Sequence, residues 1–161
     1  MATPKDQQRA LELIEEAMKH QLAQEFTDAI RLYKQSIAIY PTADAHTYLG
    51  WAYSFLGRLN EAIAECELAI EIDPEFGNPY NDIGVYLMQQ QRFDDAIPWL
   101  ERAKSAKRYE PRHFPYINLG RIYLTKGMIQ KALDEFGGAL KINADDGDLA
   151  QLVEELKTKL Q

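Results

Sequence analysis

The chain of 161 residues contains a single cysteine, Cys66, so it cannot form an internal disulfide, and no second cysteine completes a metal-binding pair. It also lacks any uncharged apolar run that approaches the ~18 residues of a membrane-spanning helix. Its first residues are polar and do not have the pattern of a secretory leader. These absences predict a protein of a reducing compartment, and we expect a cytoplasmic location.

Positive charge is also scarce. The sequence holds 18 lysine and arginine residues against 25 aspartate and glutamate residues, a formal net charge of −7. Such a chain repels a phosphate backbone or an anionic bilayer at long range, so nucleic acid and membranes are disfavoured as partners. With 46% hydrophobic and 27% charged residues, the composition predicts one folded domain, residues 1–161, with a continuous core.

The sequence contains an internal repeat. Segments 45–74, 78–103 and 115–140 align without internal gaps, and segment 7–41 is a weaker fourth copy. Each copy has a small residue followed twelve positions later by an alanine: Ala17 with Ala29, Gly50 with Ala62, Gly84 with Ala96, and Gly120 with Ala132. Two helices pack closely only where side chains are small, so each pair predicts a contact within a helical hairpin. The larger apolar residues recur at helical and not at strand spacing.

The second copy carries the fullest set of motif residues. They are Leu49, Gly50, Tyr53, Gly57, Ala62, Ala69 and Pro74. In order and spacing they resemble the tetratricopeptide repeat, a helix–turn–helix unit of about 34 residues. The resemblance implies an all-α, right-handed superhelical solenoid of four antiparallel helix pairs, at residues 7–41, 43–74, 77–110 and 113–144. The first copy departs most from the pattern, since Glu16 stands where the family has leucine.

Residues 147–161 follow the last copy and predict a capping helix. Their apolar residues fall on one face of a helix: Leu149, Leu152, Val153, Leu156 and Leu160. A repeat unit cannot bury its core alone, so this face should cover the exposed end of the stack.

Helix starts are marked by capping residues. Thr3 before Pro4 predicts an N-cap with proline at the first helical position, and Asn78 before Pro79 has the same form. The residues expected to cap the second helices of the repeats are Thr27, Asn60 and Asp94.

Side chains for catalysis are few. His20 and His46 fall at core positions of the repeat, and Cys66 occupies a position that is usually aromatic in the tetratricopeptide family, so we interpret all three as packed structural residues. The sequence has no histidine–glutamate pair at metal-binding spacing, no glycine-rich phosphate loop and no Gly-x-Ser-x-Gly elbow. We therefore predict no enzymatic activity, no cofactor and no metal.

The family resemblance implies that the first helices of the repeats line a concave groove that binds a protein or peptide. The first-helix residues that the core does not need, with one neighbour, are the predicted contacts: Trp51, Phe55, Asn81, Val85, Met88, Phe114, Ile117, Arg121 and Leu124. Most are apolar or aromatic, and a monomer has little reason to expose such a stripe. Alternatively, Trp51 and Phe55 fill space between neighbouring repeats.

One subclass of the family holds acidic C-terminal tails with lysine, arginine and asparagine side chains at fixed groove positions. In the two possible registers those positions carry Ile14, Met18, Tyr48, Asn78 and Asp82, or Thr47, Trp51, Asp82, Phe114 and Asn118. Neither register supplies a cation, so this clamp is absent. We expect an uncharged or amphipathic partner segment, held by apolar anchors and asparagine hydrogen bonds.

Residues 98–131 are locally basic, with eight cations against Glu101 and Glu110. This segment is interpreted as a solvated face, and the alternative is a second surface for an acidic partner or for weak self-association between solenoids. The predicted function is a non-enzymatic scaffold or adaptor. The alternatives are an accessory factor in secretion or pilus assembly and a regulatory subunit that masks an enzyme.

Overall fold

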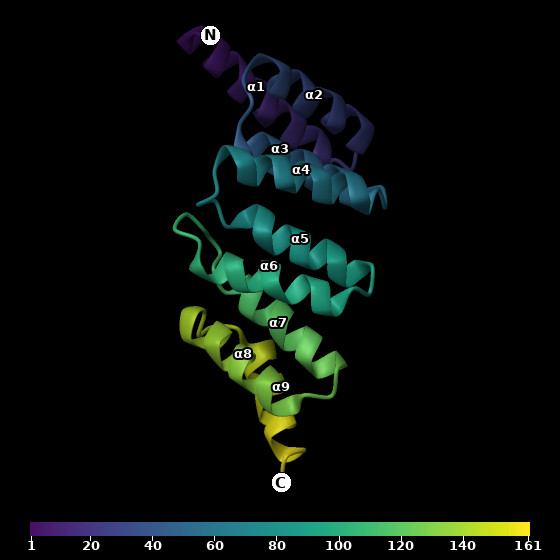
Figure 1. Ribbon diagram of the computed structural model, residues 1–161, viewed down its shortest axis with the longest axis vertical. Helices are drawn as coiled ribbons and strands as arrows, with labels where there is room; N and C mark the ends of the chain where they lie inside the picture. The colour runs from purple at the N-terminus through teal and green to yellow at the C-terminus, as the bar shows by residue number, and fades with distance from the viewer.

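The computed structural model describes all 161 residues and consists of nine α-helices without a β-sheet. The helices are α1 (Pro4–Leu22), α2 (Phe26–Ile39), α3 (Ala43–Phe55), α4 (Leu59–Ile72), α5 (Asn78–Gln89), α6 (Phe93–Ser105), α7 (Phe114–Thr125), α8 (Ile129–Ile142) and α9 (Gly147–Thr158). They follow one another along the long axis of the molecule, with the two termini at opposite ends (Figure 1). None of them combines the length and the apolar character that a membrane crossing requires.

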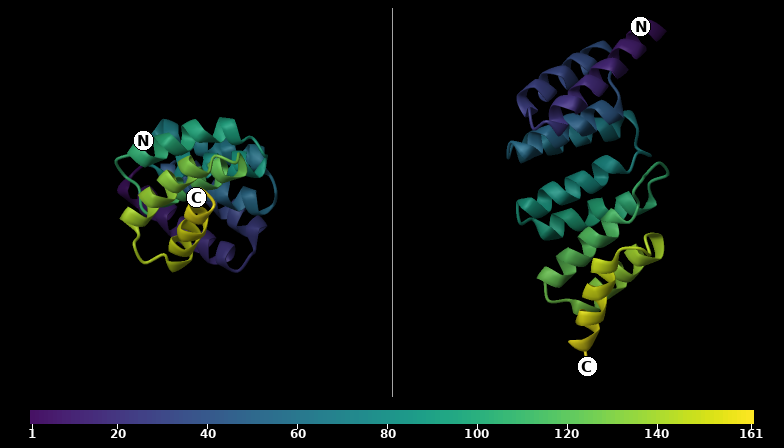
Figure 2. Two further views of the ribbon diagram at one scale, coloured as in Figure 1. Left: turned by 90° about the horizontal axis from the view of Figure 1, so that it is seen from below. Right: turned by 180° about the vertical axis from the view of Figure 1, so that it is seen from behind.

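Consecutive helices form hairpins that stack in chain order. α1 packs on α2, α3 on α4, α5 on α6 and α7 on α8, and each second helix also packs on the helix that follows it. The first helices of neighbouring hairpins touch as well, since α3 contacts α5 and α5 contacts α7. The view from behind shows the same succession, and the view from below looks along the stack (Figure 2). The predicted all-α helical-repeat solenoid is confirmed.

Small residues allow the close approach within each hairpin, as the sequence indicates, but the facing groups vary. A Cβ atom at Gly50 would lie 2.9 Å from the carbonyl oxygen of Ala62. A Cβ at Gly84 would lie 2.5 Å from the side chain of Leu100, and one at Gly120 would overlap the ring of Phe136. In the last two hairpins, glycine therefore makes room for a large side chain one turn beyond the expected alanine.

The apolar core has two main parts. One cluster of 20 buried residues runs from α1 to α7, and a second cluster of six joins α8 to α9. Leu149, Val153 and Leu156 of α9 are buried against Ala132, Phe136 and Ala139 of α8, so α9 covers the end of the stack. The expectation for Leu160 is wrong, because α9 ends at Thr158 and Leu160 is exposed.

The starts of the helices agree with the sequence only in part. Thr3 caps α1 through a reciprocal contact with Asp6. Asn78 is the first residue of α5 and not its cap, which is Gly77. The predicted caps of the second helices are wrong too. α2, α4 and α6 begin earlier, at Phe26, Leu59 and Phe93, and their cap residues make no side-chain hydrogen bond.

The turn within each hairpin explains these early starts. In all four turns one residue adopts a positive φ: Gln24 at 61°, Gly57 at 73°, Gln91 at 61° and Gly127 at 74°. A left-handed residue reverses the chain within a few residues, so the second helix starts before the polar side chain that the sequence offers as a cap.

Candidate protein-binding surface

The predicted contact residues lie on α3, α5 and α7, which we call the first-helix face. Equivalent positions on the three helices are fixed by Gly50, Gly84 and Gly120. α3 contacts α5 and α5 contacts α7, so the three helices that carry these residues are neighbours in the stack. Their exposure differs: Trp51, Phe55, Phe114 and Arg121 are exposed, Val85, Met88, Ile117 and Leu124 are half-buried, and Asn81 is buried.

Two large aromatic side chains are prominent on this face. Trp51 is 39% exposed and Phe55 is 53% exposed. Their rings lie 5.4 Å apart, and Phe55 also stacks on Phe26 with ring centroids 4.8 Å apart and nearly parallel planes. The three rings form one aromatic cluster that remains partly accessible to solvent. The alternative that these residues fill space between repeats therefore holds for only part of their surface.

Phe26 is missed by a prediction that considers the first helices alone, because it begins α2, a second helix. A sequence signal exists, since the first residue of every second helix is apolar: Phe26, Leu59, Phe93 and Ile129. In the first repeat this position lies next to the C-terminal end of α3 and supports Phe55.

Two asparagines hold α5 and α7 together. The side-chain amide of Asn118 donates a hydrogen bond to Oδ1 of Asn81 at 3.0 Å, and both residues are buried. The oxygen of Asn81 is thus already engaged within the protein. For further hydrogen bonds, Asn81 has its amide hydrogens and the second lone pair of this oxygen.

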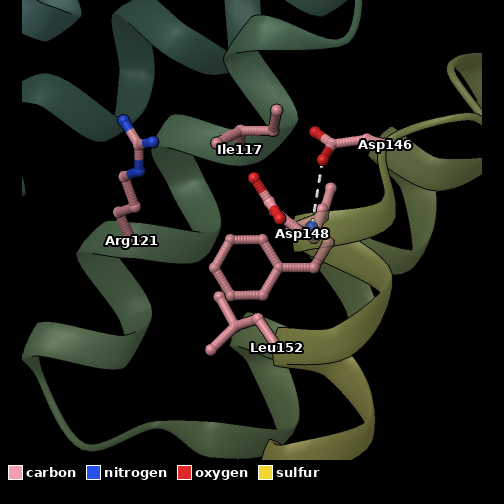
Figure 3. A pocket seen from close by; sticks show the side chains of 7 residues that line it. Ile117, Arg121, Asp146, Asp148 and Leu152 are labelled. Carbon is pink, nitrogen blue, oxygen red and sulfur yellow. Dashed lines mark hydrogen bonds between the residues drawn. The ribbon is translucent and has the colours of Figure 1, made fainter.

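Arg121 borders a pocket of about 300 Å³ between α7 and α9 (Figure 3). Ile117, Asp148 and Leu152 line the same pocket, and Asp146 accepts a hydrogen bond from the backbone of Leu149 at 3.0 Å. The guanidinium of Arg121 lies on the opposite side of the pocket from the two aspartates. It takes part in none of the ion pairs of the structure, so it is a cation free to meet a partner.

Most other cations of residues 98–131 are occupied within the chain. Lys104 pairs with Glu135 at 2.7 Å and with Glu101 at 3.3 Å. Lys107 lies 3.7 Å from Glu75, and Lys126 pairs with Asp94. Two further cations lie over aromatic rings, Arg102 above Tyr80 and Trp99, and Lys131 above Tyr123. The local positive charge is therefore largely matched by acidic and aromatic side chains of the same molecule.

Arg108 belongs to an arrangement that we call the loop clip, formed by residues 75–77 and 108–109. The backbone amide of Gly77 donates to the carbonyl of Arg108, and the amide of Arg108 donates to the carbonyl of Glu75, both at 2.9 Å. The Arg108 guanidinium lies 4.0 Å from the centre of the Phe76 ring and pairs with Asp73 at 2.8 Å. The hydrogen bonds from Arg108 hold the pKa of Asp73 below its ordinary value.

The spacing from Ala96 to Ala132 is 36 residues, against 34 from Ala62 to Ala96, and the loop clip accounts for the difference. The connection between α6 and α7 needs extra residues to reach back to the connection between α4 and α5. Tyr109 packs so closely on Gly77 that a Cβ there would lie 2.5 Å from the tyrosine side chain. The unusual spacing of 36 residues is the signal in the sequence that marks this contact.

Of the three residues predicted to be packed in the core, His46 and Cys66 are buried and His20 is not. His46 is buried, and its Nδ1 atom lies 2.7 Å from a carboxylate oxygen of Glu65. Cys66 is fully buried, and burial raises the pKa of its thiol well above the ordinary value, which keeps the thiol protonated and unreactive. His20 is only half-buried, so its expected place in the core is wrong.

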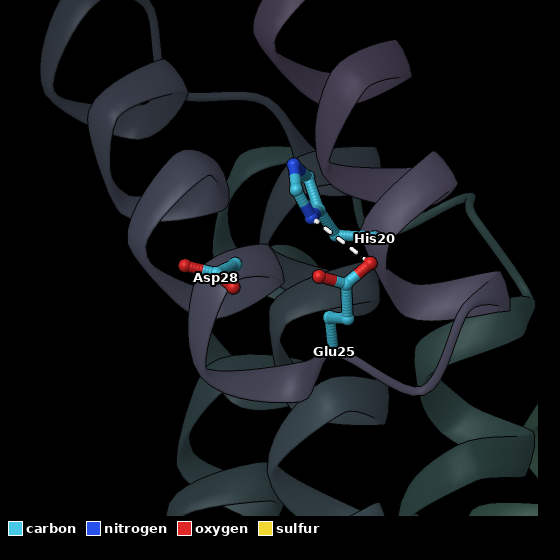
Figure 4. Close-up of side chains that lie close together, drawn as sticks. All are labelled: His20, Glu25 and Asp28. Atoms are coloured by element: carbon cyan, nitrogen blue, oxygen red, sulfur yellow. Dashed lines mark ion pairs between the residues drawn. The ribbon is translucent and has the colours of Figure 1, made fainter.

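His20 lies close to two acidic side chains at the turn between α1 and α2 (Figure 4). The possible ligand atoms of His20, Glu25 and Asp28 lie within 4.8 Å of one another. His20 faces Glu25 at 3.6 Å, while Asp28 faces Arg31 at 3.8 Å. Surface ion pairs therefore account for the cluster.

The stacked hairpins and the exposed first-helix face define a helical-repeat scaffold for protein–protein interaction. Models of the tetratricopeptide repeat match residues 43–76, 80–108 and 115–146, which together make up more than half of the chain. The chain belongs to the tetratricopeptide repeat family. Repeats of this kind typically serve as non-enzymatic scaffolds.

Known proteins resemble the chain to different extents. The small glutamine-rich tetratricopeptide repeat-containing protein 2 of Mycosarcoma maydis is 30% identical over 93 residues, which are 57% of this chain and 26% of that protein. The chain thus spans about a quarter of the length of this curated relative. The structure of pilF from Pseudomonas aeruginosa has a TM-score of 0.88 at 22% identity, over 96% of this chain and 70% of that chain.

A further similar structure is YrrB, described as a TPR protein with an unusual peptide-binding site. Its TM-score is 0.71 at 17% identity, over 91% of this chain and 74% of that chain. At these identities, the similarity to both solved structures is a similarity of fold.

Proposed function

We propose that the protein is an adaptor that binds a peptide or helix of another protein on its first-helix face, between α3 and α7. The exposed aromatic cluster of Trp51 and Phe55 supports this proposal most directly. Aromatic side chains with one packed face and one accessible face are typical anchors of protein interfaces. Val85, Met88, Ile117 and Leu124 extend the apolar surface along the neighbouring helices.

The partner expected here is an amphipathic segment. The first-helix face offers apolar area along its length and a free cation, Arg121, near the C-terminal end of the stack. An accessory factor in pilus or secretion assembly, or a subunit that masks an enzyme, would use this same surface. Substitutions on this surface therefore test the proposal whichever of these roles applies.

The proposal is tested by affinity capture with three forms of the protein. Trp51→Ala removes the aromatic anchor from α3, and Leu68→Ala removes an apolar side chain of similar exposure, 41%, from α4, a second helix. Proteins retained by the parent and by Leu68→Ala but lost with Trp51→Ala support binding at the first-helix face. Equal loss with Leu68→Ala, or no loss with Trp51→Ala, would place binding elsewhere. Circular dichroism checks that each variant remains helical.

A further inference from the structure

Asp82 of α5 is an acidic side chain without a cation. It is half-buried, and it belongs to none of the ion pairs and none of the side-chain hydrogen bonds of good geometry in the structure. Burial raises the pKa of Asp82 to about 7, and the neighbouring amide of Asn81 offsets only part of this effect. A carboxyl group is rarely left in such a position unless it meets a partner.

The repeat register shows which way Asp82 faces. Asp82 lies two residues before Gly84, as Asn118 lies two residues before Gly120. Asn118 reaches the preceding first helix, where it bonds to Asn81. By the same register, Asp82 lies on the side of α5 that faces α3. On α3, the residue at the position equivalent to Asn81 is Thr47.

The hydroxyl hydrogens on this side of α3 are donated to the helix backbone. Thr47 donates its hydrogen to the carbonyl of Ala43 at 2.8 Å, and Ser54 donates to the carbonyl of Trp51 at 2.7 Å. Neither hydroxyl hydrogen is therefore available to the carboxylate.

Tyr86, one turn beyond Asp82 on α5, is a second unpartnered polar group. The residue is 3% exposed, and its buried hydroxyl has no hydrogen bond of good geometry, although Ser54 and Asp82 lie beside it. The other groups that act on this site are the thiol of Cys66 from α4 and the hydroxyl of Tyr109 from the loop clip, and both remain protonated at neutral pH. The space between α3 and α5 thus gathers acceptors and weak acids, and the cation Arg112 acts on Tyr109 but not on Asp82.

We propose that the first-helix face recognises a lysine or arginine side chain of its partner, which enters between α3 and α5 and pairs with Asp82. This inference rests on the proposed function and adds the charge of the bound segment. The apolar residues that flank the cation pack on Trp51, Phe55 and Val85. The unpartnered Tyr86 hydroxyl, one turn along α5, is a further acceptor for the same cation.

Physical arguments favour this occupant over others. An ion pair is stronger where the surroundings are less polar than water, and Asp82 is already desolvated in the free protein. A neutral residue leaves the carboxyl unpaired, and an acidic residue meets like charge, so the site discriminates between partners. A bound cation also favours the ionised carboxyl, so binding near neutral pH releases protons and strengthens as the pH rises from 6 to 8.

A random library of 12-residue peptides displayed on phage provides the probe. Selection on the parent protein should enrich peptides with one lysine or arginine between apolar residues. An enriched peptide is then synthesised with its basic residue and with methionine in that place, and both are titrated calorimetrically at pH 6, 7 and 8 in two buffers of different ionisation enthalpy. The methionine peptide tests the proposal on the unaltered protein.

Matched variants complete the experiment. Asp82→Asn should weaken binding of the basic peptide at least tenfold at pH 8, leave the methionine peptide within twofold and abolish proton release. Asp134→Asn, which alters an exposed acidic residue on α8, a second helix, should change the basic peptide less than threefold. Selected peptides without a basic residue, or equal affinity with Asp82→Asn, overturn the proposal while the face still binds. Failure to select any peptide that Trp51→Ala weakens overturns the proposed function and this inference together.

Discussion

Gly138 of α8 lies directly against the ring of Tyr116 on α7, so close that a Cβ atom at residue 138 would be 2.7 Å from ring atom Cδ1. The neighbouring Gly137 has open space where a Cβ would be placed. Two adjacent glycines in the middle of one helix thus have different roles. One permits the packing of α7 on α8, and the other only lowers the stability of α8.

This difference predicts opposite effects of alanine at the two positions. Gly137→Ala should raise the free energy of unfolding by about 1 kcal/mol, because alanine favours the helix. Gly138→Ala should lower it by roughly 1–2 kcal/mol, because the new methyl group displaces Tyr116. Urea unfolding of both variants measures the two values. Equal stabilisation by both substitutions would show that Tyr116 moves aside without cost.

The left-handed residues of the hairpin turns provide a second prediction. Gln24 and Gln91 have φ values of 61°, where a side chain costs roughly 1–2 kcal/mol relative to glycine. Gln24→Gly and Gln91→Gly should therefore stabilise the protein, by about 0.5–1 kcal/mol each after the added freedom of the unfolded chain is counted. Gly57→Ala is the reverse control and should destabilise. Thermal unfolding that ranks these variants in any other order contradicts the role assigned to the turns.

Removal of α9 provides the third prediction. Deleting residues 147–161 exposes Phe136 and Ala139, which α9 covers, so the melting temperature should fall and aggregation should increase. Differential scanning calorimetry of the truncated protein measures the change. An unchanged melting curve for a monomeric truncated protein would count against the capping role.

The fourth prediction concerns binding by the first-helix face. For a peptide selected on the parent protein, Trp51→Ala should weaken binding about 30-fold or more, because an interface aromatic contributes about 2 kcal/mol or more. Arg121→Ala should act mainly on the salt dependence and the association rate. Calorimetry and stopped-flow fluorescence distinguish the two effects. Tight binding by Trp51→Ala, together with loss of binding after substitution of Arg102 on α6, would move the partner to the second helices.

The fifth prediction is a dependence of stability on pH. The pKa of Asp82 is about 7 in the folded protein and near its ordinary value of 3.8 in the unfolded chain, so between these values the folded state binds more protons. This contribution to stability is present at low pH and is lost as the pH rises toward 7, by at most about 1.4 kcal/mol per pH unit.

The Asp82→Asn variant isolates this effect. Relative to the parent, its free energy of unfolding should increase as the pH is raised from 5 to 8, since other titrating groups cancel in the difference. Denaturant unfolding at several pH values measures it. A difference between parent and variant that stays constant from pH 5 to 8 would mean that the carboxyl is well solvated.

Much of the fold could be predicted because the repeat fixes its own register. Gly50 and Gly84 mark equivalent helix positions, and helical spacing of apolar residues is a local property of the sequence. Helix starts were predicted less well. Thr27 and Asn60 have the right chemistry for a cap, but the left-handed residues at Gln24 and Gly57 reverse the chain first.

The candidate site was predictable in outline only. The register places Trp51 and Val85 on one surface, whereas burial depends on neighbours from other repeats. Asn81 illustrates this limit, because its partner Asn118 is 37 residues away. In the sequence, Asp82 is notable only because it is acidic at a position where the family members that bind acidic tails have lysine, arginine or asparagine. That it forms no ion pair is a property of the folded molecule.

The loop clip has a mechanical consequence. A solenoid in which each repeat contacts only its neighbours can bend at each junction between repeats. Two backbone hydrogen bonds between residues 75–77 and 108 join the connections on both sides of the α5–α6 hairpin, along one edge of the stack. We therefore expect the middle of the solenoid, around the α5–α6 hairpin, to bend less than its two ends. If the proposed partner binds at Asp82 and Val85, we expect it to meet a surface of nearly fixed curvature, with any adjustment of helix angle confined to the ends of the stack.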